Sequence, residues 1–465
     1  MAEPTGKPSG PKWLKPRLPP LPDTESVRVG RAVVEKLKAA GHEAYFVGGF
    51  VRDWLLRIEH LDIDIATSAH PEVVQELFEK TRAVGAHFGV VLVELDGHSI
   101  EVATFRTDGT YKDSRRPENV EYGTLEQDAD RRDFTVNALY YDPVEEKLVD
   151  LVQGQLDLRR RMLRTVGAAA KRFQEDALRI MRAIRFASHY ELEVDGGTRK
   201  AFNVRAKNLD NISKERIGEE LLKIFTGSNR GRSMNLMHEL KVWPHVIPEV
   251  EELVGCEQGK KTHPEGDVFI HTALALDKLP DNPPPALAMA TLLHDIGKPR
   301  TRSQGGGIHF YNHQHVGAEM AREICTSLKF SGDLTNQIVY LVERHMDFFQ
   351  VKDLRPAKIK RFVGREDFQL HLELHRADSL ASDGDLTSYE YCVQQREKLK
   401  EEYGHALTPE PLATGHDLIE LGMKPGPPFS DILDDLHDEQ LEGRISTREE
   451  ALAFLQSRAD KAKSE

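Results

Sequence analysis

The hydrophobic pattern of the first third of the chain alternates between helical and strand periods. Residues 26–40 place five apolar positions on one helical face: Val27, Val29, Val33, Val34 and Leu37. Residues 43–47 and 61–65 predict strands, residues 50–56 and 71–82 predict helices, and residues 88–105 predict a hairpin turning at Asp96-Gly97. The polar residues 106–123 predict a mobile loop. This alternation predicts an α+β domain built on a small sheet.

The rest of the chain has helical periodicity alone. Residues 156–188, 200–255 and 268–402 predict helices, and a seam rich in Gly, Pro and Lys at residues 255–266 separates the last two regions. We therefore expect an α+β head, an all-α neck and body, and a second all-α domain. The predicted boundaries are a disordered tail at 1–25, the head at 26–155, the neck and body at 156–256, the second helical domain at 257–402 and a helical C-terminal tail at 403–465.

Length and composition support several domains in a cytoplasmic protein. A chain of 465 residues is too long for one core. No apolar run approaches the ~18 residues of a membrane span, and the first residues have no apolar core of a signal peptide. The three cysteines lie far apart, which predicts reduced packing residues. The net charge of −13 argues against a protein that binds nucleic acid over most of its surface. A local basic groove is still compatible with this net charge.

Candidate chemistry begins at Gly48 and Gly49, between the first predicted strand and the helix 50–56. Two glycines allow a sharp turn close to a ligand, and the following helix directs its first amides at it, an arrangement that suits phosphate. Asp62 and Asp64 share one face of the next strand, where their charges repel unless a cation such as Mg²⁺ lies between them. The alternative is a glycine turn followed by an exposed acidic strand. Together the features favour phosphoryl transfer.

The run from Gly48 to Thr67 resembles the signature of the DNA polymerase beta nucleotidyltransferase superfamily. Within that superfamily, the sequence pattern Gly-Gly-x-Val-Arg-Asp-x-Leu-Leu…Asp-x-Asp-x-x-Thr resembles that of class II tRNA nucleotidyltransferases (CCA-adding enzymes) and their bacterial poly(A) polymerase relatives. The resemblance covers about residues 28–225 and implies a head of the polymerase-beta type. It also implies that Asp62 and Asp64 hold the catalytic Mg²⁺, with Gly48, Gly49 and Arg52 at the nucleotide.

Two residues of the hairpin are further candidates. Glu101 lies in its second strand, where a carboxylate facing the Asp pair would complete a two-metal clamp. A surface strand glutamate is an equal alternative. Arg106, at the end of that strand, is a candidate phosphate contact.

The run Arg131-Arg132-Asp133-Phe134-Thr135-Val136-Asn137 carries the second motif. Arginine offers planar donors to triphosphate oxygens, and Asp133 and Asn137 lie four residues apart, on one side of a helix. Taken alone, the run is also compatible with a helix start and a solvated charge pair. Its resemblance to the family's second motif implies that Asp133 selects the ribose hydroxyl, with Arg132 and Asn137 beside it.

The third motif lies in residues 171–186, where Ala177, Ile180, Met181 and Ile184 predict a core-facing helix. Asp176, Arg179 and Arg182 follow one another at intervals of three on another face, as in a salt-bridged helix. In the family that the chain resembles, the Glu-Asp-x-x-Arg motif selects the incoming base and so takes the place of a nucleic-acid template. The match implies that Asp176 and Arg179 read the base edge, with Glu175 in support and Arg182 nearby.

The second helical domain has its own constellation: His271, His294, Asp295 and Asp378. This ordered set resembles the ligands of the HD superfamily of metal phosphohydrolases. Imidazoles with carboxylates suit Ni²⁺, Mn²⁺, Fe²⁺ or Co²⁺ better than Mg²⁺ alone. His315 and His345 are candidates for additional ligands or a phosphate contact. Retention of the module as an RNA-binding scaffold is an alternative to hydrolysis.

The leading hypothesis is addition of C and A to the 3′ end of tRNA from CTP and ATP. A poly(A) polymerase is the first alternative. The resemblance disfavours it, because poly(A) polymerase relatives typically carry paired basic residues before the Phe of the hairpin, whereas Gly85-Ala86-His87 precedes Phe88 here. A CC-adding or A-adding enzyme is the next alternative. CC-adding relatives lack a working loop after the third strand, so the full-length loop at residues 108–117 implies that A addition is possible. A metal phosphohydrolase with a nucleotide-sensing head belongs to a different class. The oligomeric state stays open.

Overall fold

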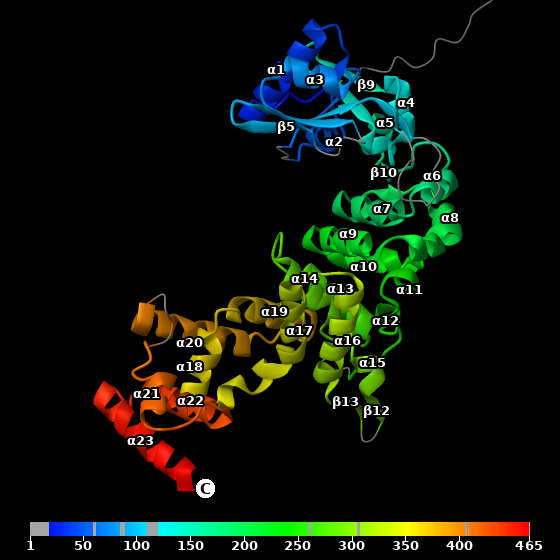
Figure 1. Cartoon of the computed structure of the whole chain (residues 1–465). Helices are drawn as coiled ribbons and strands as arrows, with labels where there is room; N and C mark the ends of the chain where they lie inside the picture. Colours follow the sequence, from blue (N-terminus) through cyan, green and yellow to red (C-terminus); the bar gives the residue numbers. More distant parts are fainter. Residues whose placement is uncertain are drawn as a thin grey trace, which may run out of the picture. The chain divides into compact units, whose positions relative to one another are not determined.

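A computed structural model describes residues 18–58, 62–83, 89–108, 120–259, 263–304, 307–404, 407 and 409–464. The chain forms two compact units, residues 1–212 and 213–465 (Figure 1). The five predicted boundaries divide the chain more finely than these units do, and they stay predictions. No helix in the described part of the chain is long and apolar enough to cross a membrane.

The first unit contains the sheet and the helices around it. Its first strands are β1 (Ala44–Val47), β2 (Asp64–Thr67), β3 (Thr81–Ala83), β4 (Val90–Leu95) and β5 (His98–Thr104). They are followed by β6 (Arg106–Asp108), β7 (Val120–Tyr122), β8 (Leu139–Asp142), β9 (Lys147–Asp150), β10 (Met162–Leu163) and β11 (Glu193–Val194). The helices are α1 (Glu25–Ala39), α2 (Gly49–Leu56), α3 (Pro71–Leu77), α4 (Leu125–Arg131), η2 (Thr135–Asn137), α5 (Gly154–Arg159), α6 (Ala169–Glu175), α7 (Leu178–His189), α8 (Gly196–Arg205) and η3 (Ala206–Asn211).

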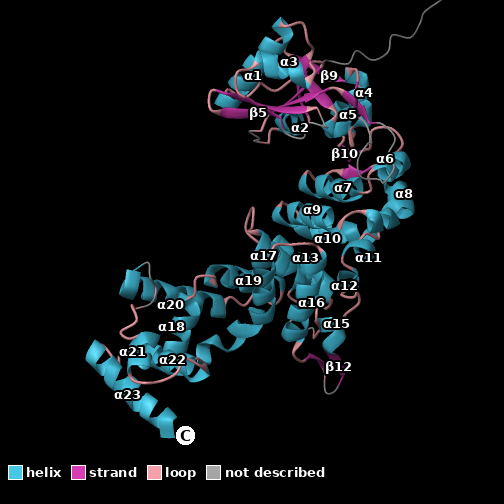
Figure 2. Ribbon diagram, in the orientation of Figure 1, coloured by secondary structure: helices cyan, strands magenta, loops and turns pink. Residues whose placement is uncertain are grey.

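Seven of the described strands form one mixed sheet in the order β3-β4-β5-β2-β1-β8-β9. Among the described strands of this sheet only β2 and β5 pair in parallel, and β4 and β5 form the predicted hairpin. Its turn has positive φ at both Asp96 and Gly97, as a type I′ turn requires. Helices α1 and α3 cover one face of the sheet, and α2 lies on the other (Figure 2). The predicted fold class is confirmed.

The packing of α1 determines which residues of the central strands are buried. All five apolar residues predicted for its inner face are buried. Gly30 lies so close to the sheet that a Cβ atom there would come within about 3.2 Å of Phe46 and Ile63. Ile63 and Ile65 therefore face α1, and the alternating residues Asp62 and Asp64 face the opposite side.

Several predicted elements end earlier than their hydrophobic pattern suggested. The predicted helix 71–82 stops at Leu77, and residues 81–83 pair instead with β4 as an edge strand. The ends of the predicted loop 106–123 pair as β6 and β7. The helix expected across residues 171–186 is broken between α6 and α7, where Asp176 is extended. In each case backbone pairing or a local cap outweighs periodicity.

The second unit is almost wholly helical in its described residues. It begins with α9 (Lys214–Thr226), α10 (Arg230–Glu239), α11 (Trp243–Val246), α12 (Pro248–Glu251), α13 (Val268–Asp277), α14 (Pro285–Leu293) and α15 (Lys298–Thr301). A hairpin of β12 (Arg302–Gln304) and β13 (Ile308–Phe310) interrupts the predicted helical run. Then follow α16 (His313–Ser327), α17 (Gly332–Arg344), η4 (His345–Asp353), α18 (Pro356–Gly364), α19 (Phe368–Ala381), α20 (Thr387–Tyr403), α21 (Gly415–Glu420), α22 (Pro427–Leu441) and α23 (Arg448–Ser464).

The C-terminal helices α21–α23 have an apolar core of their own, formed by residues such as Leu418, Leu436 and Leu455. The predicted helical tail is therefore a packed module. Three sequence arguments lie outside the described residues: the N-terminal tail 1–17, the residues 84–88 before the hairpin, and the loop 109–119.

Candidate functional sites

The glycine turn lies where the sequence predicted it. Gly48 is the N-cap of α2 and has a φ of 70°, a left-handed conformation that glycine adopts without strain. A Cβ atom at this position would come within 3.6 Å of Arg132 Nη1. The turn and the first amides of α2 therefore lie beside a guanidinium group, an environment suited to a polyphosphate.

Two predicted carboxylates, Asp64 and Glu101, are paired on one face of the sheet, and the third, Asp62, lies two residues before Asp64 in the chain. Asp64 begins β2 and is directly opposite Glu101 in the parallel pairing with β5. Side chains in register on neighbouring strands point to the same face. Asp62, Asp64 and Glu101 are all exposed, whereas Ile63 and Val102 are buried on the other face. An all-oxygen set that also leaves room for substrate fits a hard cation such as Mg²⁺.

Arg132 is held in place by residues that the sequence reading missed. Asp128 is buried and accepts hydrogen bonds from Arg132 Nη2 at 3.0 Å, from Arg131 Nη2 at 2.6 Å and from the Tyr140 hydroxyl at 2.7 Å. Burial alone would raise the pKa of Asp128, but Arg132 and Arg131 outweigh it and lower that pKa. The position of Asp128, one turn before the Arg pair, was the available signal.

Asp133 links the second and third motifs. Its Oδ2 accepts from Arg182 Nε at 2.9 Å and Nη2 at 2.7 Å, and its Oδ1 accepts from Asn137 Nδ2 at 3.1 Å. Burial opposes the charge, but Arg182 lowers the pKa of Asp133, so the carboxylate is ionised at neutral pH. Arg52 is buried and donates to Asn137 Oδ1 at 2.7 Å. Its observed contacts are thus those of a residue that positions Asn137.

The third motif is less regular than predicted. Asp176 caps the break between α6 and α7, where its Oδ1 accepts from the Leu178 amide at 3.0 Å. The prediction that Asp176 shares a helical face with Arg179 and Arg182 is therefore wrong. Arg179 donates to Glu175 Oε2 at 2.8 Å and to the Arg131 carbonyl at 3.1 Å, which ties α7 to the second motif. Arg106 lies half-buried in β6.

In the second unit, all four predicted HD ligands converge in a buried cluster. His271 Nε2 lies 3.0 Å from Asp378 Oδ1 and 3.3 Å from His294 Nε2. His294 Nε2 lies 3.3 Å from Asp295 Oδ2. Gly297, just after this pair, permits a close approach of α16, because a Cβ there would lie 2.3 Å from the His313 carbonyl oxygen.

The cluster also contains His313 and His345. His313 Nε2 lies 3.5 Å from Asp295 Oδ1, and His345 Nε2 lies 3.8 Å from the same oxygen. The sequence had suggested His345 and His315, but His315 is exposed and outside the cluster. We call the six residues His271, His294, Asp295, His313, His345 and Asp378 the HD centre. Its mixed donors fit a transition metal.

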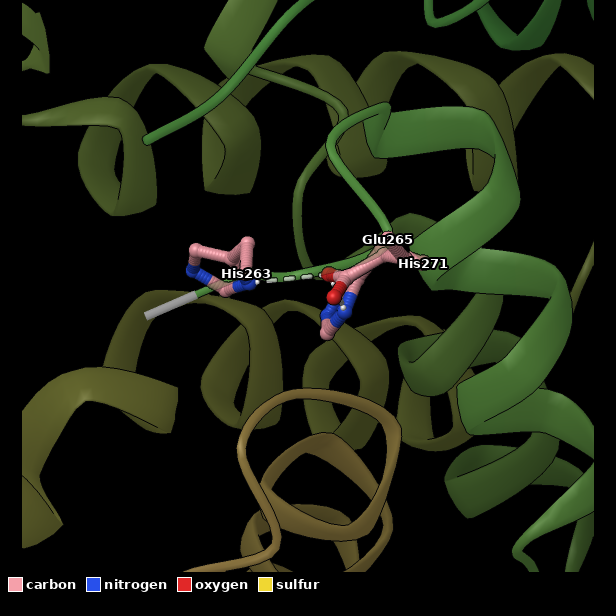
Figure 3. Close-up of side chains that lie close together, drawn as sticks. All are labelled: His263, Glu265 and His271. Atoms are coloured by element: carbon pink, nitrogen blue, oxygen red, sulfur yellow. Dashed lines mark hydrogen bonds and ion pairs between the residues drawn. The ribbon is translucent and has the colours of Figure 1, made fainter. Parts of the chain in front are cut away.

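A carboxylate orients the first histidine of the HD centre. Figure 3 shows Glu265 beside both His263 and His271, with its Oε1 at 3.0 Å and 2.9 Å from their Nδ1 atoms. A carboxylate behind a ligating imidazole fixes the ring and makes it a better ligand. Glu265 thus leaves Nε2 of His271 directed at the cluster.

Histidines of the HD centre differ in the direction in which their pKa values are shifted. Burial lowers the pKa of His271, but Asp378 and Glu265 outweigh it and raise this pKa to about 9. Burial, reinforced by neighbouring His294, lowers the pKa of His345 to about 3, and burial also lowers that of His313. His313 and His345 are therefore neutral at pH 7, the form that binds metals.

A cavity of about 500 Å³ opens onto the HD centre. Its wall includes Asp295, His313 and Asp378 together with Lys298, His263 and the exposed ring of Phe349. Cationic and aromatic groups beside a candidate metal site suit a phosphoester carrying a ring.

Three family models match consecutive parts of the chain. Residues 44–164 match the poly A polymerase head domain, residues 191–253 match the probable RNA- and SrmB-binding site of polymerase A, and residues 263–383 match the HD domain. The second and third motifs therefore lie inside or next to the matched head and RNA-binding regions.

One relative and one solved structure match over most of the chain, and a second relative matches over about half of it. The CCA-adding enzyme of Streptococcus suis is 33% identical over 424 residues, which cover 90% of this chain and 94% of that protein. The CCA-adding enzyme of Lactococcus lactis subsp. cremoris is 45% identical over 225 residues, or 48% of this chain and 56% of that protein. The crystal structure of the Bacillus stearothermophilus CCA-adding enzyme in complex with CTP is 27% identical, covers 95% of this chain and 99% of its own, and has a TM-score of 0.73.

Proposed function

The chain belongs to the family of CCA-adding enzymes, and on that premise we propose that it adds C and A to the 3′ end of tRNA from CTP and ATP, releasing pyrophosphate. The observation that carries the proposal is the parallel register of Asp64 with Glu101, with Asp62 on the same exposed face. A degenerate, nucleotide-sensing head has no need for three aligned carboxylates.

The proposed reaction is attack of the terminal 3′-hydroxyl of tRNA on the α-phosphate of the nucleotide. Asp62, Asp64 and Glu101 would hold Mg²⁺, which would lower the pKa of the attacking hydroxyl and stabilise the leaving oxygens. Gly48, Gly49 and the first turn of α2 would receive the triphosphate, with Arg132 as a planar donor and Arg106 as a further phosphate contact.

The second and third motifs would select the nucleotide. Asp133 faces the ribose hydroxyl in this proposal, while Asn137 and Arg52 support it. Asp176 and Arg179 would offer an acceptor and a donor to the base edge, with Arg182 held by Asp133 alongside. Because Asp133 bonds to both Asn137 and Arg182, and Arg182 lies on α7 together with Arg179, ribose and base selection would be coupled.

Incubation of the protein with tRNAs ending in the discriminator base, in C or in CC tests the proposal. CTP and ATP are supplied separately and together, and the products are sequenced. We expect all three substrates to be completed to CCA when both nucleotides are present. A CC-adding enzyme would stop before A, a poly(A) polymerase would build an A tail from ATP alone, and the absence of any product would contradict the proposal.

The HD centre supports a second candidate activity, hydrolysis of phosphoesters such as 2′,3′-cyclic phosphates at RNA ends. The cavity beside six converging ligand residues, with Lys298 in its wall, favours this over an RNA-holding role. An assay with Ni²⁺, Mn²⁺ or Co²⁺ tests it. Metal-loaded protein that cleaves no phosphoester would support the RNA-holding alternative.

We place both activities in the cytoplasm, where tRNA is processed.

A further inference from the structure

A second cavity of the helical unit adjoins the cavity at the HD centre. It has a volume of about 930 Å³, and its wall includes residues of η4 and α18 together with His437 of α22. We call it the η4–α18 cavity. Met346 and Phe349 line both cavities, so the two cavities meet at these side chains.

Positive charge dominates the wall of the η4–α18 cavity. Its described lining residues include four cations, Arg344, Lys358, Arg361 and Arg365, and one carboxylate, Asp347. Asp347 lies 3.5 Å from Arg344 and offsets that charge. A concave surface with an excess of cations attracts a polyanion.

Two of these cations are not engaged by a carboxylate. Arg361 pairs with two carboxylates of α22, at 2.6 Å and 3.0 Å from its Nη atoms. Arg365 donates to the Tyr340 hydroxyl at 2.9 Å instead, and in the described part of the chain neither Arg365 nor Lys358 has a carboxylate within ion-pair distance. Both side chains are exposed in the cavity wall and are available to phosphate groups.

Phe349 presents an aromatic ring at the junction of the two cavities. It is 66% exposed, although its neighbour Phe348 is fully buried in a hydrophobic core and fixes the backbone there. A single exposed Phe is common on protein surfaces. An exposed ring beside cations, however, is the combination by which proteins hold single-stranded nucleic acid, because a base stacks on the ring while the cations contact the phosphates.

His375 leaves polar atoms for a ligand in the cavity at the HD centre. Its ring is 6% exposed and stacks on Phe348, with 4.3 Å between the ring centroids. It lines this cavity, and neither of its ring nitrogens has a hydrogen-bond partner among the described residues. A buried imidazole without partners is costly unless a ligand supplies them. The cavity therefore suits a ligand with polar groups beyond its phosphate.

We propose that the two cavities together hold the end of a single-stranded RNA. Lys358 and Arg365 contact the phosphates of the strand, a base stacks on Phe349, and the terminal nucleotide enters the cavity at the HD centre beside His375. The inference deepens the phosphoester hydrolysis proposed for that centre, since it names a polynucleotide end as the substrate. Binding of the strand does not itself depend on hydrolysis.

Neither of two rival ligands accounts for both cavities. A mononucleotide would occupy the cavity at the HD centre and leave the cations of the η4–α18 cavity without a role. A double helix keeps its bases stacked inside and offers none to Phe349.

Fluorescence anisotropy with the intact protein tests the stacking and the phosphate contacts. The probe is a labelled RNA hexanucleotide that ends in a 2′,3′-cyclic phosphate. Phe349→Ala should weaken binding about 5- to 100-fold. Tyr311→Ala should not, because this ring is 68% exposed and lines neither cavity. Lys358→Ala should reduce the slope of log Kd against log salt concentration by about 0.7, whereas Lys352→Ala, at an exposed position outside both cavities, should leave it unchanged.

Amine labelling followed by mass spectrometry locates the strand, whichever other part of the chain also binds RNA. Saturating hexanucleotide should protect Lys358 from labelling and leave Lys352 as reactive as before. Unchanged labelling of Lys358, or equal affinity of Phe349→Ala and Tyr311→Ala for the hexanucleotide, overturns the proposal.

Hydrolysis in the presence of Ni²⁺ separates this inference from the proposed hydrolytic activity. The kcat/KM for the hexanucleotide should exceed that for a mononucleoside 2′,3′-cyclic phosphate, and Phe349→Ala should lower this ratio. Protection of Lys358 without hydrolysis of either substrate would refute the hydrolytic activity and support the RNA site. Equal kcat/KM for both substrates, with Lys358 unprotected, would overturn the RNA site and leave the hydrolytic activity standing.

Discussion

The two candidate sites differ in where their ligands lie. Asp62, Asp64 and Glu101 are exposed on a sheet and offer oxygen alone. The HD centre is buried, with His271 0% and His294 1% exposed, and mixes nitrogen with oxygen. Exposed carboxylates stay hydrated until metal and nucleotide arrive together, whereas buried imidazoles and carboxylates lose their water on folding and need a resident ion. The comparison predicts a transient metal in the head and a retained one in the HD centre.

Substitution of Asp64 should give the largest effect. Asp64→Ala removes a metal ligand from the transition state and should lower nucleotide addition by at least about a thousandfold, measured by labelled CTP incorporation. Metal retained in the HD centre should not change. Glu94→Ala, an exposed carboxylate on β4 of the same sheet, is the control. Near wild-type addition by Asp64→Ala in Mg²⁺ would show the head assignment to be wrong, and the same holds for Asp62→Ala.

Substitution of Asp295 should have the opposite effect, with loss of metal from the HD centre and unchanged nucleotide addition. Asp295→Ala removes a carboxylate that lies beside His294, His313 and His345 in the HD centre, and it should eliminate retained metal and any phosphoester hydrolysis, while CCA addition continues. Metal analysis alongside the phosphodiesterase assay checks this. Metal content equal to that of the wild type would refute the ligand assignment of Asp295.

Arg179 tests whether the third motif reads the base. Arg179→Ala should reduce discrimination of CTP and ATP against UTP and GTP by about 10- to 100-fold, because a lost donor leaves a base acceptor unpaired. Incorporation of each nucleotide alone gives the ratio, and Arg185→Ala on the same helix is the control. An equal loss of rate with all four nucleotides would assign Arg179 to its contacts with Glu175 and the Arg131 carbonyl instead.

The smallest expected effect concerns pH and the metal-free protein. His345, with its pKa lowered to about 3, stays neutral when folded, but it takes up a proton near pH 6.5 when unfolded. Stability should therefore fall as pH drops below about 6.5, by up to about 1.4 kcal/mol per pH unit for this residue. His271, with its pKa raised to about 9, stays protonated in the folded state, and it opposes this slope only near pH 6.5, because below about pH 5.5 the unfolded state is protonated as well.

Denaturant unfolding of chelator-treated protein between pH 6.5 and pH 5 measures this slope. His345→Gln cannot titrate and should give a shallower dependence than the wild type, with His315→Gln as an exposed control. Identical slopes in all three proteins would mean that His345 is not held neutral by burial.

Motifs within one element were predictable from sequence, because their spacing fixes their shared face or turn. The strand–Gly-Gly–helix run and His294 at the end of an apolar helix occur as expected. Asp62 and Asp64 are both exposed and Ile63 between them is buried, as the alternation predicted, although β2 begins only at Asp64. The fold class was also predictable, since the change from alternating to purely helical periodicity is visible along the chain.

Contacts between elements were decided by the tertiary structure. The pairing of Glu101 with Asp64 depends on strand order in the sheet, and the bond of Asp133 to Arg182 joins residues far apart in sequence. The helix expected at Asp176 is broken there because its carboxylate caps the Leu178 amide. His313 rather than His315 enters the HD centre because the close approach at Gly297 sets which side of α16 is buried. Sequence thus determined which chemical groups are available, and packing decided which of them meet.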